Sequence, residues 1–241
     1  MMLLFPGLSW AGDCLKSEFI LAIDIGHSLS RGGAMSARGI SEYSYNRKFA
    51  EMLLSRMVKG GFKKTFLINP EGRDLSFDQR IKIAESNRAN LIVSVHHDSV
   101  QPHYLLTWQY GNKTRQYSDK YRGFSIFYSA SNNKAEESLH FAEMIGDELL
   151  NNGFSPSLHH AEKIKGENRL LIDKDRGIYR FDQLAMLKGN LPAVLLECGI
   201  IVNRDEEMAF SDDENKEKMV LSILRAIEKY CKNIEHHHKL K

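Results

Sequence analysis

An almost unbroken apolar run at residues 19–25 stops at a glycine that is followed directly by His27. Such a run predicts a strand buried on both faces, which is typical of the parallel sheets of α/β proteins. After a glycine-rich loop, Glu42 begins a segment whose apolar residues recur at helical spacing. We therefore expect His27 at the carboxyl end of a strand and Glu42 in the first turn of a helix, at the edge where open α/β sheets bind ligands.

The remaining apolar segments alternate between strand and helix patterns. Further strands are predicted at residues 63–69, 91–95, 123–129 and 192–197, and helices at 41–58, 76–88, 136–151 and 214–231. Residues 99–122 read as a long polar loop with several aromatic side chains, and the pattern at 154–175 indicates no regular structure. We expect a single α/β domain with a twisted, mostly parallel sheet of about six strands, flanked by helices on both faces.

Two further strands end in residues that carry chemistry. Histidine follows the run at residues 91–95, and Glu197 ends the run at 192–197. Parallel strands place their carboxyl ends side by side, so His27, His96 and Glu197 are expected at one edge. Imidazole and carboxylate ligands suit Zn²⁺, and catalytic zinc sites commonly use three protein ligands with one open position. Alone, His27 and Glu42 would have simpler roles, as a loop histidine and an acid that complements the helix dipole.

Four motifs, in this order, carry a family resemblance: IDIGH, GISE, NPEGRDLSFDQRIKIAESNRANLIVSVHHD and PAVLLECGIIVN. They closely resemble the zinc-dependent N-acetylmuramoyl-L-alanine amidases of bacterial cell-wall hydrolysis, the amidase-3 family, over residues 19–230. The resemblance implies that His27, Glu42 and His96 bind one Zn²⁺ and that Glu197 is the catalytic glutamate. It also implies cleavage of the amide between the lactyl group of N-acetylmuramic acid and L-alanine in peptidoglycan, and hence a periplasmic or secreted protein.

The sequence leaves more than one role open for three polar residues in these motifs: His97, Asp24 and Asn203. A strand alternates faces, so only one of His96 and His97 can point at a metal without distortion. The motif favours His96, and His97 is then expected on the surface or in support of the ligands. Asp24 either orients His27 or is satisfied by backbone groups. Asn203 either stabilises a turn or contacts substrate.

The two polar segments suggest regulation. Glu162 and Glu167 lie in the second of them, and we expect that either carboxylate blocks the zinc until a protein activator displaces it. The aromatic side chains of residues 104–121 either stack on sugar rings or pack on their own domain.

Composition limits the remaining choices. The formal net charge of +2 is too small to argue for a nucleic-acid partner, and no apolar run is long enough for a membrane span. Cys14, Cys198 and Cys231 are odd in number and widely spaced, so they indicate neither a thiolate metal site nor a clear disulfide framework. We expect a monomer with an N-terminal extension or signal remnant at residues 1–18, a catalytic domain at 19–231 and a polar tail at 232–241.

Two other functions fit the same residues. A zinc carboxypeptidase-like peptidase would use the same chemistry, but it needs an arginine beside the zinc to hold a terminal carboxylate. A wall-binding protein with a catalytically silent zinc site is the second alternative. The presence of all three candidate ligands together with Glu197 argues against it.

Overall fold

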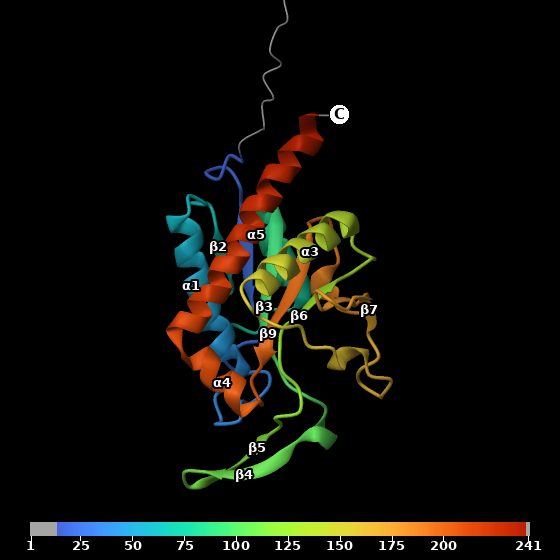
Figure 1. Cartoon of the computed structure of the whole chain (residues 1–241). Coiled ribbons are helices and arrows are strands. Elements are labelled where there is room, and N and C mark those ends of the chain that lie inside the picture. Colours follow the sequence, from blue (N-terminus) through green and yellow to red (C-terminus); the bar gives the residue numbers. More distant parts are fainter. Residues whose placement is uncertain (1–13, 240–241) are drawn as a thin grey trace, which may run out of the picture.

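The apolar runs form a seven-stranded sheet in the order β2-β1-β3-β9-β6-β8-β7 (Figure 1). The computed structural model describes residues 14–239. The strands of this sheet are β1 (Leu21–Ile25), β2 (Phe66–Ile68), β3 (Leu91–Asp98), β6 (Ser125–Tyr128), β7 (Leu170–Asp173), β8 (Ile178–Arg180) and β9 (Ala193–Ile200).

The sheet is mixed but mostly parallel. Strands β2, β1, β3 and β9 run parallel to one another, β6 is antiparallel to β9, and β8 is again parallel to β6. The predicted fold class is therefore confirmed. Five of the seven strands coincide with the predicted apolar runs, and β7 and β8, which pair antiparallel with each other, are additional. Strand β7 lies in the segment for which the sequence indicated no regular structure. Its short, half-exposed residues explain why no apolar run marked it.

Helices cover both faces of the sheet, as predicted. The helices are α1 (Glu42–Lys59), α2 (Phe77–Ser86), α3 (Ala135–Asn151), α4 (Arg204–Ser211) and α5 (Asp213–Lys239). Helices α1, α3 and α5 bury their apolar stripes on one face, where Phe49, Phe141 and Ile223 belong to the same core. On the other face, α2 and a 3₁₀ turn at Ala185–Leu187 cover a smaller core. Two apolar faces explain why the central strands are apolar without alternation.

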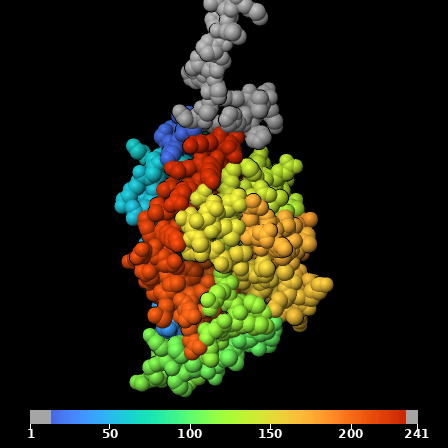
Figure 2. All heavy atoms as spheres, in the orientation of Figure 1, coloured from blue at the N-terminus to red at the C-terminus, as the bar shows by residue number. Residues whose placement is uncertain are grey.

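The predicted long loop at residues 99–122 is in fact an antiparallel hairpin. Strands β4 (Leu106–Tyr110) and β5 (Lys113–Tyr117) pair only with each other, and the hairpin projects from the end of the molecule opposite the C-terminus (Figures 1 and 2). Its side chains are mostly exposed, so the sequence offers no apolar face as a signal. The Trp108 indole packs on its own domain, where its Nε1–H donates to the Ala37 carbonyl at 3.0 Å.

A disulfide between Cys14 and Cys231 joins the start of the described chain to α5. The widely spaced cysteines gave no sign of this pairing, because residues 217 positions apart meet only once the sheet is formed. Helix α5 also continues to Lys239, beyond the end predicted for it at residue 231. The suggested signal remnant falls largely on residues 1–13, which lie outside the described residues. Within residues 14–239, no helix combines the length and apolar character needed to span a membrane.

Candidate metal centre

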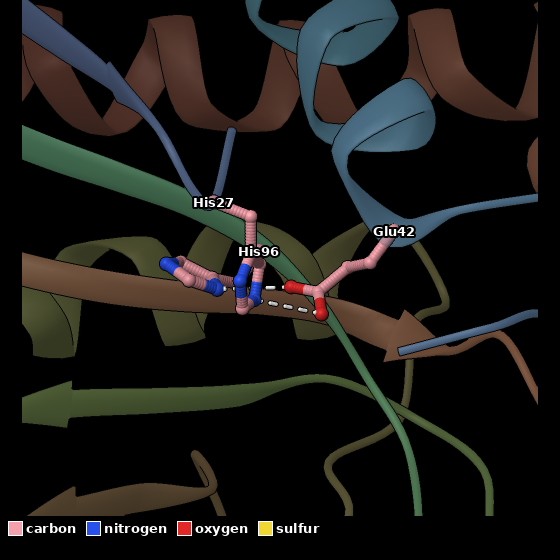
Figure 3. Close-up of side chains that lie close together, drawn as sticks. All are labelled: His27, Glu42 and His96. Carbon is pink, nitrogen blue, oxygen red and sulfur yellow. Dashed lines mark hydrogen bonds and ion pairs between the residues drawn. The ribbon is translucent and has the colours of Figure 1, made fainter. Parts of the chain in front are cut away.

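Three side chains from separate elements converge at the carboxyl edge of the sheet (Figure 3). His27 follows β1, Glu42 begins α1, and His96 lies near the end of β3. The Nε2 atom of His27 lies 2.9 Å from one Glu42 carboxylate oxygen, and Nδ1 of His96 lies 2.9 Å from the other. One donor atom of each residue falls within 4.8 Å of the others. The three residues predicted as ligands are thus brought together with the nitrogen and oxygen donors that suit zinc.

The backbone of His27 is held by a buried ion pair beneath it. His27 has a left-handed conformation with φ of 68°, which is uncommon for a residue other than glycine. Arg80 of α2 donates to the His27 carbonyl at 2.6 Å and to the Asp24 carboxylate at 2.7 Å. The second Asp24 oxygen accepts the Ser94 hydroxyl at 2.6 Å. Asp24 therefore supports His27 through Arg80 rather than through the imidazole.

Glu42 is surrounded by donors. The Ala34 backbone N–H donates to its Oε2 at 3.0 Å, and the Asn46 amide donates to its Oε1 at 3.3 Å. Burial alone would raise the pKa of the Glu42 carboxyl, but hydrogen bonds to His27 and His96 outweigh it and hold the pKa well below its usual range. Glu42 is therefore a carboxylate, the form that binds a metal ion.

Two glycines allow the donors to approach one another. A Cβ at Gly26 would lie 2.5 Å from the His96 ring, and one at Gly33 would lie 2.3 Å from the Glu42 carboxylate. Gly33 also has a φ of 73°, which side chains disfavour. The glycine-rich loop therefore makes the space in which His27, His96 and Glu42 meet.

The two adjacent histidines point to opposite sides of β3. His96 joins His27 and Glu42, whereas His97 is buried under α1, with its Nδ1 2.8 Å from the Asn46 side-chain oxygen. Burial lowers the pKa of His97 to about 3, so its ring is neutral. His97 is therefore not on the surface. It supports the site through Asn46, which contacts Glu42 and which the sequence analysis did not single out.

Glu197 lies on β9, directly beside the candidate ligands. Its Cα is paired in register with that of His96 on β3. The Oε2 atom is buried and has no hydrogen-bond partner among the described residues. Burial, aided by the carboxylates of Asp98 and Glu42, raises the pKa of Glu197 well above its usual range. A carboxyl group of raised pKa close to a metal site is suited to accepting and returning a proton.

A pocket of about 440 Å³ opens beside the imidazoles of His27 and His96. Two arginines line it, and each already has a carboxylate partner: Arg31 lies 3.2 Å from Asp74, and Arg80 pairs with Asp24. The pocket therefore reaches two of the three donors, His27 and His96, and both arginines in its lining already face a carboxylate.

The remaining predicted residues have other contacts. Asn203 caps α4, because its side-chain oxygen accepts the backbone N–H groups of Asp205 and Glu206. Glu162 accepts the hydroxyls of Tyr104 and Tyr121, and Glu167 pairs with His160. The carboxylates suggested as blocking groups thus make their contacts away from the three candidate ligands.

The fold and the site together define an open α/β protein with a candidate metal centre at the carboxyl edge of its sheet. Residues 21–229 match the profile of the Amidase_3 family, described as N-acetylmuramoyl-L-alanine amidase. The chain belongs to this family of cell-wall hydrolases.

One curated relative is similar in sequence, and solved structures share the fold. The chain is 25% identical over 223 residues to a candidate N-acetylmuramoyl-L-alanine amidase of Buchnera aphidicola subsp. Baizongia pistaciae, covering 88% of this chain and 95% of that protein. The amidase Ami1 of Mycobacterium smegmatis has the same fold, with a TM-score of 0.68, 22% identity, and coverage of 91% and 98% of the two chains. The CwlD amidase of Clostridioides difficile, solved in complex with the GerS lipoprotein, gives a TM-score of 0.60 at 21% identity, with 88% and 98% covered.

Proposed function

We propose that this protein hydrolyses the amide bond between N-acetylmuramic acid and the L-alanine of the stem peptide. His27, Glu42 and His96 would hold one Zn²⁺, and Glu197 would be the general base. The observation that carries the proposal is the convergence of these three donors beside the buried, unpartnered Glu197 carboxyl. Family membership supports the choice of bond.

In the proposed hydrolysis, the zinc site, Glu197 and Arg80 have different roles. A bound zinc ion would supply a Lewis acid that lowers the pKa of water and polarises a carbonyl. Glu197 takes a proton from the attacking water and returns it to the leaving amine of L-alanine, which general acid–base catalysis requires. A raised pKa makes the ionised Glu197 carboxylate a stronger base toward water, and the carboxylic acid formed by that transfer is the proton donor for the leaving amine. The Arg80 contact holds the backbone of His27 in position throughout.

The test is digestion of purified peptidoglycan, with the products identified by mass spectrometry. The zinc-loaded protein should release stem peptides with a free L-alanine amino terminus and leave intact glycan strands. Removal of zinc by a chelator should abolish release, and added zinc should restore it. A product that lacks only its C-terminal residue would instead indicate the carboxypeptidase-like alternative.

Glu197→Gln should lower the rate of release by about 10²–10⁴-fold, because the general base is lost. The variant should retain zinc, since Glu197 is not one of the converging ligands. Glu51→Gln, on the exposed side of α1, is the matched control and should keep full activity. Binding to peptidoglycan without any release by the parent protein would favour the silent wall-binding alternative.

The proposed substrate places the protein in the periplasm or outside the cell. The Cys14–Cys231 disulfide supports this location, because disulfides persist in oxidising compartments. We also propose a protein activator. Its support is the complex that the related CwlD amidase forms with a lipoprotein.

A further inference from the structure

A second group of side chains that could hold a metal ion is not used by the proposed mechanism. Asp98 ends β3, two residues after His96, and His159 and His160 form the short 3₁₀ helix at His159–Ala161. Both histidines are buried, and the Nε2 atoms of His159 and His160 lie 3.1 Å and 2.8 Å from the same Asp98 oxygen. One donor atom of each of the three residues lies within 4.8 Å of the others.

The Nδ1 atom of each ring has a hydrogen-bond partner, and for His160 that partner shows which nitrogen carries the proton. Nδ1 of His160 lies 2.8 Å from a Glu167 carboxylate oxygen, which can only accept, so this nitrogen carries the proton. Nδ1 of His159 lies 2.8 Å from the Ser157 hydroxyl. Metal-bound histidines are typically oriented in this way, with the second ring nitrogen hydrogen-bonded to a carboxylate or another oxygen. The Nε2 atom of each ring faces the Asp98 carboxylate.

The facing atoms have no hydrogen bonds. Oδ2 of Asp98 and Nε2 of both histidines are buried, and none of these atoms makes a hydrogen bond of good geometry among the described residues, although both rings lie at ion-pair distance from the carboxylate. A lone pair on a neutral imidazole repels a carboxylate oxygen at such distances, and burial of unpaired polar atoms costs free energy. The three atoms therefore need a positive charge, supplied either by a metal ion between them or by a proton on a ring.

We propose that Asp98, His159 and His160 form a second Zn²⁺ site, separate from the one proposed at His27, Glu42 and His96. Two imidazoles and one carboxylate suit zinc, whereas Ca²⁺ and Mg²⁺ prefer oxygen ligands alone. The site ties the segment that follows α3 to the end of β3. Asp98 follows His96 by two residues, and the Cα of His96 is paired with that of Glu197, so this site would lie near the general base of the proposed function, on which this statement rests.

The competing occupant is a proton. Burial lowers the pKa of His160, but the carboxylates of Asp98 and Glu167 outweigh it and raise the pKa to about 9. In that case the cluster is a buried ion pair with no metal. Counting the metal ions in each chain separates the two readings directly.

The experiment measures zinc per chain after the metal is stripped, Zn²⁺ is added and the excess is removed. His236, His237 and His238 near the chain end are another source of imidazole, so all proteins carry serine at these three positions. The parent should bind two equivalents and His27→Ala one. His27→Ala combined with Asp98→Asn should bind none, because both sites have lost a ligand. His140→Ala, which removes an exposed histidine of α3, should still bind two.

Failure of this proposal is distinguishable from failure of the proposed function. A parent that binds one equivalent and loses it in His27→Ala has only the first site, and the second-site proposal is then wrong. Retention of one equivalent in the double variant would also overturn it. Because Asp98→Asn is a buried change, the His27→Ala protein alone gives a second measurement: Zn²⁺ should raise its unfolding temperature, and Co²⁺ should give a visible absorption band. Absence of both effects contradicts the second site.

Discussion

Single residues determine whether the three candidate ligands can meet. Gly26 is the clearest case, because a methyl group there would occupy the space of the His96 ring. The sequence shows this glycine only as the end of an apolar run, and the reason for it is visible only in the packing of the strand end. The left-handed conformation of His27 is similarly invisible in the sequence, since it depends on the Arg80 contact from α2.

Gly26→Ala is predicted to displace the His96 ring and lower kcat/KM on peptidoglycan by about 100-fold, because small displacements of catalytic groups have effects of this size. Zinc affinity should fall in the same protein. Gly60→Ala, at the far end of α1, meets only contacts of 3.2 Å or longer and is the matched control, expected to retain activity. Activity and zinc affinity of Gly26→Ala within twofold of the parent would show that His96 does not need this space.

At the scale of elements, α2 is tied to β1 by a buried charge. Arg80 and Asp24 lie between the helix and the sheet, and Arg80 also donates to the carbonyl of Ile25 at 2.6 Å. The sequence places Arg80 on the helix predicted before the His96 strand, where we expect a contact between helix and sheet, but it does not identify Asp24 and His27 as the partners. The capping box at Ser76 fixes where α2 begins, and thereby places Arg80 one turn later beneath His27.

Arg80→Met is predicted to lower the free energy of unfolding by about 3–5 kcal/mol, because it leaves the Asp24 carboxylate buried without its cation. The Arg80→Met/Asp24→Asn double variant should lose less than the sum of the two single changes, since the unpaired charge is then gone. Urea unfolding of the four proteins measures both quantities. Additive losses would mean that the two side chains do not act as a pair.

Elements with a clear apolar pattern were predictable, and those whose residues depend on distant contacts were not. Apolar runs predict strands β1, β3 and β9. The candidate ligands could then be predicted from the residues that follow these runs, because parallel strands end at the same edge of a sheet. The β4–β5 hairpin has exposed side chains on both faces and could not be recognised by periodicity. The Asp98–His159–His160 cluster joins the end of β3 to two residues about 60 positions later, in a segment without a periodic pattern, so only the folded chain reveals it.

At the scale of the whole molecule, the two ends of the described chain are fastened together. The Cys14–Cys231 disulfide closes a loop of 217 positions, and the ammonium of Lys16 pairs with Glu228 on the same helix. Cys14 and Lys16, which precede β1, are thereby attached to the folded domain. The predicted boundary at residue 19 follows the apolar pattern but does not describe these contacts.

Cys14→Ser is predicted to lower the free energy of unfolding by about 2–4 kcal/mol, chiefly because the unfolded chain is no longer constrained by the cross-link. Cys231→Ser and the double variant should lose the same amount, since any one of these changes removes the whole bond. Urea unfolding under non-reducing conditions gives the three values, and thiol counting should find one free thiol, Cys198, in the unfolded parent. Three free thiols in the parent, or additive losses in the double variant, would show that the cross-link is absent and remove its support for an oxidising compartment.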